Sequence, residues 1–293
     1  MQPDVDPTGA LVVYAVGLPL VLFLILVEAV YCNVKSWEYY KLSDTLCSLG
    51  LLSGNIVVNA SLKTVTLGLY LHLYQFRWLE INKILPVWAI WLLSFVAIDF
   101  VFYWYHRVSH RMRFLWAVHM NHHSSEEMNF VVAFRQAWLG PVTKIPFFAC
   151  LPLIGFDPTI TLVAGVGATL WGVVGHTKIV DKLWRPIEWF FNTPSHHRVH
   201  HGSNPEYIDK NYGNLLIIWD RMFGTFEPER APVIYGLRHN VGTYNPVTIT
   251  LMDWKALFVK MRSADSPVQA LCYFFSPPGW EPTSKRIEKS AEH

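Results

Sequence analysis

Residues 192–201 read Asn-Thr-Pro-Ser-His-His-Arg-Val-His-His and are followed by Gly202. This stretch places four histidines within six positions, in a chain that has 13 histidines among 293 residues. Imidazole is a common ligand of zinc, copper, iron and nickel, so this density predicts a metal site. Thr193 or Asn192 is expected to cap a short helix that has Pro194 at its first position. Gly202 is then expected to end that helix in a left-handed conformation.

Two earlier segments also carry histidines at helical spacing. One is His106-Arg-Val-Ser-His110, and the other is His119-Met-Asn-His-His123. The second has the same H-x-x-H-H spacing as His197-Arg-Val-His-His201. Residues three or four apart lie on one face of a helix, so a pair of imidazoles from each segment can reach one ion, and the third histidine of each triplet is expected to lean toward a second ion. Eight histidines exceed the about four ligands that one zinc ion takes, which favours two metal ions.

Two further histidines are candidate ligands. His196 directly precedes the last triplet and would share in binding only if two ions lie side by side. His176 ends a stripe formed by Ala164, Ala168 and Gly172, each four residues from the next. Small residues at this spacing let helices approach closely. His176 is therefore expected to reach the site from outside the dense segments, although a lone histidine can instead form an interfacial hydrogen bond.

The composition predicts a membrane protein. Hydrophobic residues make up 52% of the chain and charged residues only 16%, which is too apolar for an ordinary soluble domain. The 13 Trp, 13 Tyr and 18 Phe are expected where many segments cross a bilayer interface. The net charge is only +2 and no basic block is present, so nucleic acid is not an expected partner. The four cysteines are far apart in the sequence, which predicts neither a thiolate metal site nor a disulfide framework.

The hydropathy pattern predicts an all-α integral membrane protein with about four transmembrane helices in two hairpins. Three apolar spans are expected near 11–31, 46–74 and 86–105, and the second is expected to break or bend near Gly54. A helical hairpin is expected over 140–176, with its turn at Gly155-Phe-Asp-Pro158. A cytosolic helical cap would hold the dinuclear site.

Three regions follow from this pattern. Residues 1–105 form a transmembrane anchor, and residues 106–230 form the catalytic region, which includes the membrane hairpin. Residues 231–293 form a C-terminal cap with a short interfacial helix over 252–262 and a polar tail. Lysines and arginines flank the histidine segments, which predicts that the active site is on the cytosolic side.

The histidine segments resemble those of the fatty acid hydroxylase/sterol desaturase superfamily, as do Asp209-Lys-Asn-Tyr-Gly213 and Trp219-Asp-Arg-Met-Phe-Gly-Thr-Phe226. The resemblance extends from about residue 90 to residue 230. His122-His-Ser-Ser-Glu126 and Asn192-Thr-Pro-Ser-His-His197 are most similar to the branch that oxidises alkylglycerol ethers. The resemblance implies ten metal ligands, which are His106, His110, His119, His122, His123, His176, His196, His197, His200 and His201.

The superfamily consists of membrane di-iron oxygenases, so the resemblance implies two Fe ions, O2 and an external electron donor. The implied reaction is reductive activation of oxygen followed by hydroxylation of an unactivated C–H bond, in a lipid that enters from the bilayer. A hydroxyl group next to an ether oxygen gives a hemiacetal, which falls apart to an aldehyde and an alcohol. The donor is expected to be a separate molecule, either a reduced pterin or a protein of the cytochrome b5 or ferredoxin type.

Neutral imidazoles leave the charge of two iron ions largely uncompensated, so nearby carboxylates are expected to matter. The candidates are Asp99, Glu126, Glu127, Asp209 and Asp220, of which Asp99, Glu126 and Asp209 are the predicted catalytic carboxylates. Asp99 lies within an apolar span, where a carboxylate is unfavourable unless it has a function. Its helical stripe with His106 favours a hydrogen bond to a ligand, and the alternative is a structural bond to a neighbouring helix. Glu126 is four residues after His122, and a surface or capping role is the alternative for it and for Asp209.

Three other functions remain open at this point. A sterol or other lipid desaturase or hydroxylase of the same superfamily would share the first chemical step. A zinc-dependent membrane hydrolase would need fewer histidines and no oxygen. A metal transporter would place its ligands near the middle of the bilayer, whereas these histidines follow the ends of spans. The expected location is the bacterial inner membrane or the endoplasmic reticulum.

Overall fold

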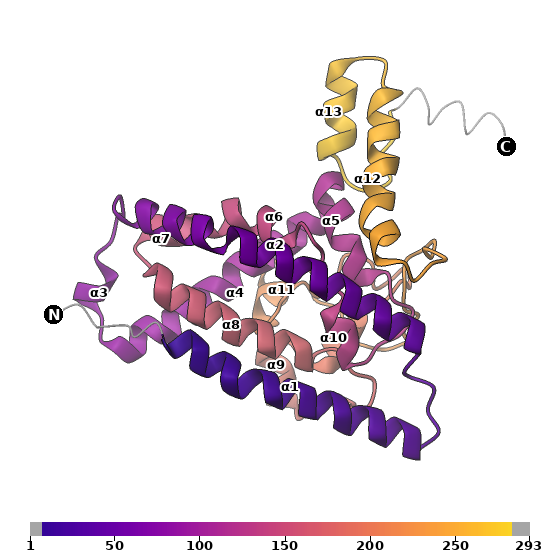
Figure 1. The fold of residues 1–293 in the computed structure, drawn as a ribbon, viewed down its shortest axis with the longest axis horizontal. Helices are drawn as coiled ribbons and strands as arrows, with labels where there is room; N and C mark the ends of the chain where they lie inside the picture. The colour runs from indigo at the N-terminus through magenta and orange to yellow at the C-terminus, as the bar shows by residue number, and fades with distance from the viewer. Residues whose placement is uncertain (1–7, 283–293) are drawn as a thin grey trace.

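The computed structural model describes residues 8–282, which form helices joined by loops (Figure 1). The helices are α1 (Thr8–Val34), α2 (Leu42–Tyr74), α3 (Ile81–Ile84), α4 (Val87–Arg111), α5 (Arg113–His123), η1 (Phe130–Phe134), α6 (Gly140–Phe148), α7 (Cys150–Ile154), α8 (Pro158–Val174), α9 (Arg185–Phe190), α10 (Pro194–His200), α11 (Ile218–Met222), α12 (Pro246–Arg262) and α13 (Pro267–Phe275). Within residues 8–282 the only β-structure consists of isolated bridges. The all-α prediction is therefore confirmed, and the predicted polar tail falls almost entirely outside the described residues.

Three of the described helices are long and apolar enough to cross a membrane, namely Ala15–Val34 within α1, Leu42–Tyr74 and Val87–Arg111. At ~1.5 Å per residue, 20 residues span the ~30 Å hydrocarbon core. Large apolar side chains stay exposed on these helices, such as Phe23 at 61% and Val65 at 69%. Soluble proteins rarely expose continuous apolar surface of this kind. The exposed faces therefore suit contact with lipid, as expected of an integral membrane protein.

The predicted hairpin is present, but it is shorter than the three spans. Its first arm is divided into α6 and α7, and Pro146 lies inside α6. Gly155 turns the chain with φ 125°, and the Asp157 side chain accepts hydrogen bonds from the first turn of α8. Because neither arm has the length of a full span, the predicted number of about four transmembrane helices is not confirmed.

The predicted break near Gly54 is wrong, because α2 runs without interruption through this residue. A Cβ atom at Gly54 would lie 2.1 Å from Nε1 of Trp138, so the glycine is needed for close approach. The neighbouring Asn55 donates a hydrogen bond to the carbonyl oxygen of Ala137 at 2.7 Å. Gly54 and Asn55 therefore contact the segment that leads into α6.

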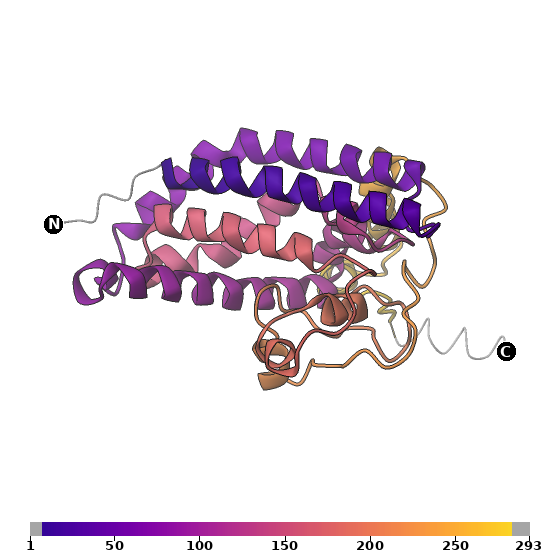
Figure 2. The ribbon, with the colours of Figure 1, turned by 90° about the horizontal axis from the view of Figure 1, so that it is seen from below.

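The long helices form a bundle whose axis lies along the longest dimension of the molecule (Figures 1 and 2). In both views α1, α2, α4 and α8 lie side by side, and α5 and α10 lie toward the end remote from the N-terminus. Ala164 and Ala168 of α8 are buried against Ile98 of α4, as the stripe of small residues predicted. This close packing brings the carboxyl ends of α4 and α8, with their histidines, to the same end of the bundle.

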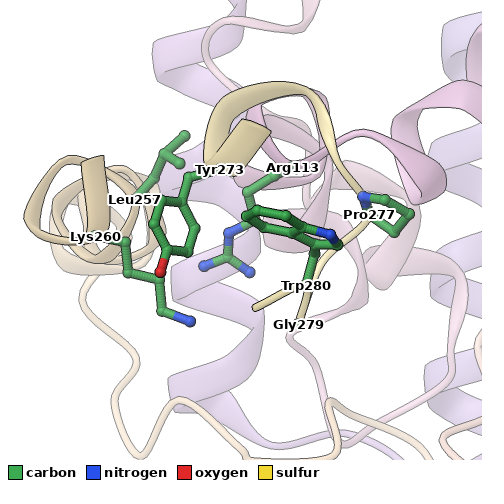
Figure 3. A pocket seen from close by; sticks show the side chains of 7 residues that line it. All are labelled: Arg113, Leu257, Lys260, Tyr273, Pro277, Gly279 and Trp280. Carbon is green, nitrogen blue, oxygen red and sulfur yellow. The ribbon is translucent and has the colours of Figure 1, made fainter. Parts of the chain in front are cut away.

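The α12–α13 hairpin stands away from the bundle and is joined to it at α5 (Figure 1). The Arg113 backbone N–H donates to the carbonyl oxygen of Ser276 at 2.9 Å, and its guanidinium donates to Asp253 at 2.7 Å. Figure 3 shows Arg113, Tyr273 and Trp280 together at this junction, around a cavity of about 10 Å³. Such a cavity holds at most about one water molecule, so the junction is a structural contact rather than a ligand site.

Candidate metal centre

Nine histidines converge where α4, α5, α8 and α10 meet, and they form two groups. The first group contains His106, His110, His119, His123 and His200. The second group contains His122, His176, His197 and His201. Within each group, one ring nitrogen per residue lies within 4.8 Å of every other, which is close enough for all of them to reach one ion.

The two H-x-x-H-H segments contribute to both groups in the same way. The first and last histidines of each triplet are four residues apart and enter one group together, whereas the middle histidine crosses to the other group. His122 thus joins the partners of His197, and His200 joins the partners of His119. The rings of His123 and His201, which belong to different groups, are stacked with centroids 4.5 Å apart. The two groups are therefore neighbours, as a dinuclear centre requires.

The Nε2 atoms within each group lie unusually close together. In the first group, Nε2 of His119 is 2.9 Å from that of His106 and 3.1 Å from that of His123. In the second group, Nε2 of His176 is 3.0 Å from that of His197. Two nitrogens bound at right angles to one ion, at about 2.1 Å each, would be about 3.0 Å apart. The spacing therefore fits nitrogens that share an ion.

Backbone carbonyl groups fix the orientation of three of these rings. Nδ1 of His106 donates to the carbonyl oxygen of Tyr212 at 2.7 Å, because a carbonyl oxygen can only accept. In the same way, Nδ1 of His200 donates to Lys210 at 2.9 Å, and Nδ1 of His176 donates to Gly172 at 2.8 Å. Each Nε2 is then left with a free lone pair that points into its group.

Two of the inward nitrogens in the first group have no hydrogen-bond partner among the described residues. These are Nε2 of His110 and Nε2 of His200, and both atoms are buried. A buried polar atom without a partner is unfavourable in a protein interior. A metal ion would satisfy both atoms, so the donor set fits a bound cation.

Burial keeps these imidazoles neutral. Desolvation lowers the pKa of His119, His123 and His201 well below the usual value, and the neighbouring imidazoles lower it further. Burial also lowers the pKa of His176 and His200 to about 4. Only the neutral form has a lone pair available for a metal ion, so these rings are ready to bind metal at neutral pH.

Two buried polar networks hold the loops behind the second group. Glu28 of α1 accepts hydrogen bonds from the Phe130 N–H at 2.8 Å and from the hydroxyl of Thr177, the residue after His176. The Arg135 guanidinium, which is 1% exposed, pairs with Asp44 of α2 at 2.8 Å. These contacts tie the membrane helices α1 and α2 to the segments that carry or adjoin the ligands.

Residues 91–225 match the model of the fatty acid hydroxylase family, and this range includes all nine converging histidines. This region of the chain is therefore similar to a fatty acid hydroxylase domain. It is also 36% identical to an alkylglycerol monooxygenase of Danio rerio over 94% of this chain and 61% of that protein. The alkylglycerol monooxygenase of Xenopus tropicalis is 34% identical over 87% of this chain and 57% of its own length.

The chain thus spans about three fifths of the length of these alkylglycerol monooxygenases. An ornithine lipid hydroxylase of Rhizobium tropici is 31% identical over 48% of this chain and 43% of its own length. No solved structure matches the chain.

The tenth predicted ligand, His196, lies outside both groups. It is the third residue of α10 and completes a capping box, with its Nδ1 3.4 Å from the backbone nitrogen of Thr193. Its Nε2 lies 3.2 Å from a carboxylate oxygen of Glu188. Both ring nitrogens are therefore engaged away from the metal centre. Nothing in the spacing of the sequence pointed to Glu188 as its partner.

The start of α10 follows the prediction, but its end does not. Thr193 caps the helix and Pro194 is its first residue, as expected. Gly202 is not among the residues with positive φ, so the predicted left-handed termination is wrong. A Cβ atom at this position would lie 2.9 Å from the ring of Tyr207 and 3.0 Å from the carbonyl oxygen of Val199. The glycine is needed for this close contact rather than for a special backbone angle.

The three predicted catalytic carboxylates lie in different settings. Asp99 is fully buried and accepts hydrogen bonds from the backbone of Leu215 and Leu216 and from the indole of Trp219, at 2.7–3.0 Å. These bonds hold the loop before α11 and involve no histidine. Glu126 is exposed, and its Cγ lies against Gly236.

Asp209 is the predicted carboxylate that faces a candidate ligand. One of its oxygens is 3.8 Å from Nδ1 of His110, and the other accepts a hydrogen bond from Arg111 at 2.7 Å. Its φ of 62° places it in the left-handed region, at the turn that leads to Lys210 and Tyr212. The carbonyl groups of that turn are the partners of His200 and His106, and a role of this kind for main-chain atoms leaves no mark in the sequence.

Proposed function

We propose that this chain is a membrane-bound di-iron oxygenase that inserts one oxygen atom of O2 into a C–H bond of a lipid. The observation that carries the proposal is the pair of adjacent, buried imidazole groups within the region similar to a fatty acid hydroxylase domain. The names of the similar alkylglycerol monooxygenases and ornithine lipid hydroxylase describe reactions of this kind. A carbon next to an ether oxygen would give a hemiacetal, which breaks down to an aldehyde and an alcohol.

The nine converging histidines are the proposed ligands. The first ion would be held by His106, His110, His119, His123 and His200, and the second by His122, His176, His197 and His201. Imidazole alone does not choose among zinc, copper, iron and nickel, and the family match favours iron. When bound, two iron ions would supply the reductive activation of O2.

The protein's own part is to orient the ligands and to exclude water. The carbonyl groups of Tyr212, Lys210 and Gly172 hold three rings with Nε2 inward. On the first group, the ring of Phe102 packs 5.2 Å from that of His106, and the ring of Trp116 packs 5.1 Å from that of His110. These apolar rings favour the approach of a hydrocarbon chain over the approach of water.

The reaction needs two electrons, for which we propose a separate donor, either a reduced pterin or a protein of the cytochrome b5 or ferredoxin type. A cavity of about 320 Å³ opens beside His196 and is lined by Glu188, Trp189 and Arg221 among others. His196 directly precedes the proposed ligand His197. A donor at this cavity would therefore be one residue away from the second group.

The histidine end of the bundle is proposed to face the cytosol, in a bacterial inner membrane or the endoplasmic reticulum. Lys35 and Lys41 lie between α1 and α2 at this end, and Arg111 ends α4 while Arg113 begins α5. Such residues favour the cytosolic side of a membrane. A cysteine placed at Lys35 should react with an impermeant thiol reagent only from the cytosolic side, and reaction from the opposite side alone would reverse the orientation.

Metal analysis combined with labelled oxygen tests the proposed function. The purified chain is expected to contain iron, and with lipid, reductant and labelled O2 it should form a lipid product that carries one labelled oxygen atom. Omitting the reductant should limit the yield to one turnover. Zinc without label in the product would support the hydrolase alternative instead. A new double bond without label would favour a desaturase, and a sterol desaturase of Gibberella zeae is 26% identical over 56% of this chain.

A further inference from the structure

Lys144 is a cation without a counterion close to the first histidine group. It lies one turn into α6, in the apolar segment Gly140–Ile154, and its side chain is partly exposed. Two other lysines near this end of the bundle form ion pairs, since Lys41 lies 2.7 Å and Lys178 3.5 Å from carboxylate oxygens of Glu127. Within residues 8–282, Lys144 has no such ion pair and no hydrogen bond. An ionisable residue in an apolar membrane segment usually serves a ligand or a partner.

Aromatic rings connect this ammonium group to the proposed metal centre. Nζ of Lys144 lies 5.8 Å from the ring centres of both Phe102 and Tyr105. The ring of Phe102 is in turn 5.2 Å from the ring of His106. These contacts limit the distance from Nζ to the centre of the His106 ring to at most about 11 Å. A cation–π contact at this range leaves the ammonium's hydrogen-bond donors unsatisfied.

We propose that Lys144 binds the anionic group of the lipid substrate, a phosphate or a carboxylate, while the reacting carbon lies at the first histidine group. This inference rests on the proposed function and adds a class of substrate to it. An extended chain covers ~1.2 Å per bond, so the distance of at most about 11 Å between Nζ and the His106 ring corresponds to at most about nine bonds of a lipid chain. The oxidised position is therefore near the polar end of the lipid and far from its terminal methyl group.

The position of α6 suits this role. Val142 on the same helix is 43% exposed, so one face of α6 is open to the bilayer while Lys144 turns toward α4. A hydrogen bond fixes α6 against α4 at this point, because the hydroxyl of Tyr105 lies 3.0 Å from that of Thr143, the residue before Lys144. A lipid that moves from the bilayer past α6 toward α4 would meet the ammonium group before it reached Phe102 and His106.

Equilibrium binding without turnover tests the proposal separately from catalysis. The iron-loaded chain in a neutral detergent, without reductant, is mixed with hexadecyl phosphate or with hexadecanol, and binding is followed by native mass spectrometry. The unmodified protein is expected to bind the phosphate at least about 10-fold more tightly than the alcohol. Lys144→Met should bind both equally, and Lys144→Arg should keep the preference. The exposed Lys63 on α2 provides the matched control, Lys63→Met, which should behave as the unmodified protein.

Each outcome decides one claim. Equal binding of both probes by the unmodified protein, or a preference that survives in Lys144→Met, would overturn the role of Lys144. Inorganic phosphate should not displace hexadecyl phosphate at equal concentration, and displacement would assign the site to free phosphate instead of a lipid. Because this assay uses no oxygen, a chain that binds hexadecyl phosphate but incorporates no label would refute only the oxygenase function.

Discussion

Replacing His197 with alanine is expected to halve the iron content of the purified chain and to reduce lipid hydroxylation by at least ~100-fold. His197 is one of the four histidines of the second group, and its Nε2 lies 3.0 Å from that of His176. Three imidazoles would remain for the second ion, while the five imidazoles of the first group would be untouched. Iron per chain is measured on the purified protein, and product is measured by lipid mass spectrometry.

The neighbouring histidine supplies the matched control. His196→Ala removes the same number of atoms from the adjacent position, but His196 faces Glu188 and lies outside both groups. It should keep its full iron content, with a modest loss of stability because the capping box at Thr193 is broken. If His196→Ala lost as much iron as His197→Ala, or if His197→Ala kept all of its iron, the assignment of the second group would be wrong.

Helical periodicity explains why the sequence predicted so much of this centre. In each H-x-x-H-H segment, positions one and five share one helical face and position four lies beside it. The structure brings all three to the same end of the bundle, with position four in the other group. His176 could be predicted because the stripe through Ala164 and Ala168 packs against α4. His196 was the exception, since its direction depends on how the chain enters α10, which the box at Thr193 decides.

Long-range contacts mark the limit of the sequence-based prediction. Gly54 suggested a break in α2, but the structure pairs Gly54 and Asn55 with Trp138 and Ala137, which lie more than 80 residues away in the sequence. Asp99 was expected to have a function within its span, but its bonds to Leu215 and Leu216 bridge more than 100 positions. A pattern within one helix shows which residues share a face, but it does not show what that face meets.

The loop anchored by Asp99 explains how buried carboxylates without a histidine contact can still act on the centre. Asp99 holds the segment before α11, and the fully buried Asp220 holds the preceding turn through the backbone N–H groups of Tyr212 and Gly213, both at 2.8 Å. The carbonyl oxygen of Tyr212 is the acceptor for Nδ1 of His106. We therefore expect Asp220 to orient the proposed ligand His106 through the main chain of Tyr212.

Asp220→Ala is accordingly expected to lower both stability and iron affinity. The substitution leaves the N–H groups of Tyr212 and Gly213 and the hydroxyl of Thr225 without their acceptor, so the free energy of unfolding should fall by about 3–6 kcal/mol. Because the Tyr212 carbonyl no longer has a fixed position, the dissociation constant for iron should rise by about 10–100-fold. Thermal unfolding in detergent and titration with ferrous iron measure the two effects.

The exposed Asp181 provides the control for loss of a carboxylate, and Asp181→Ala should change neither quantity. The two effects of Asp220→Ala also separate stability from ligand orientation. A protein that unfolds at lower temperature yet binds iron as tightly as the unmodified chain would show that the Tyr212 carbonyl does not control His106. Weaker iron binding at a temperature where the variant is fully folded is the result expected if the main chain between Lys210 and Gly213 sets the direction of the first group's ligands.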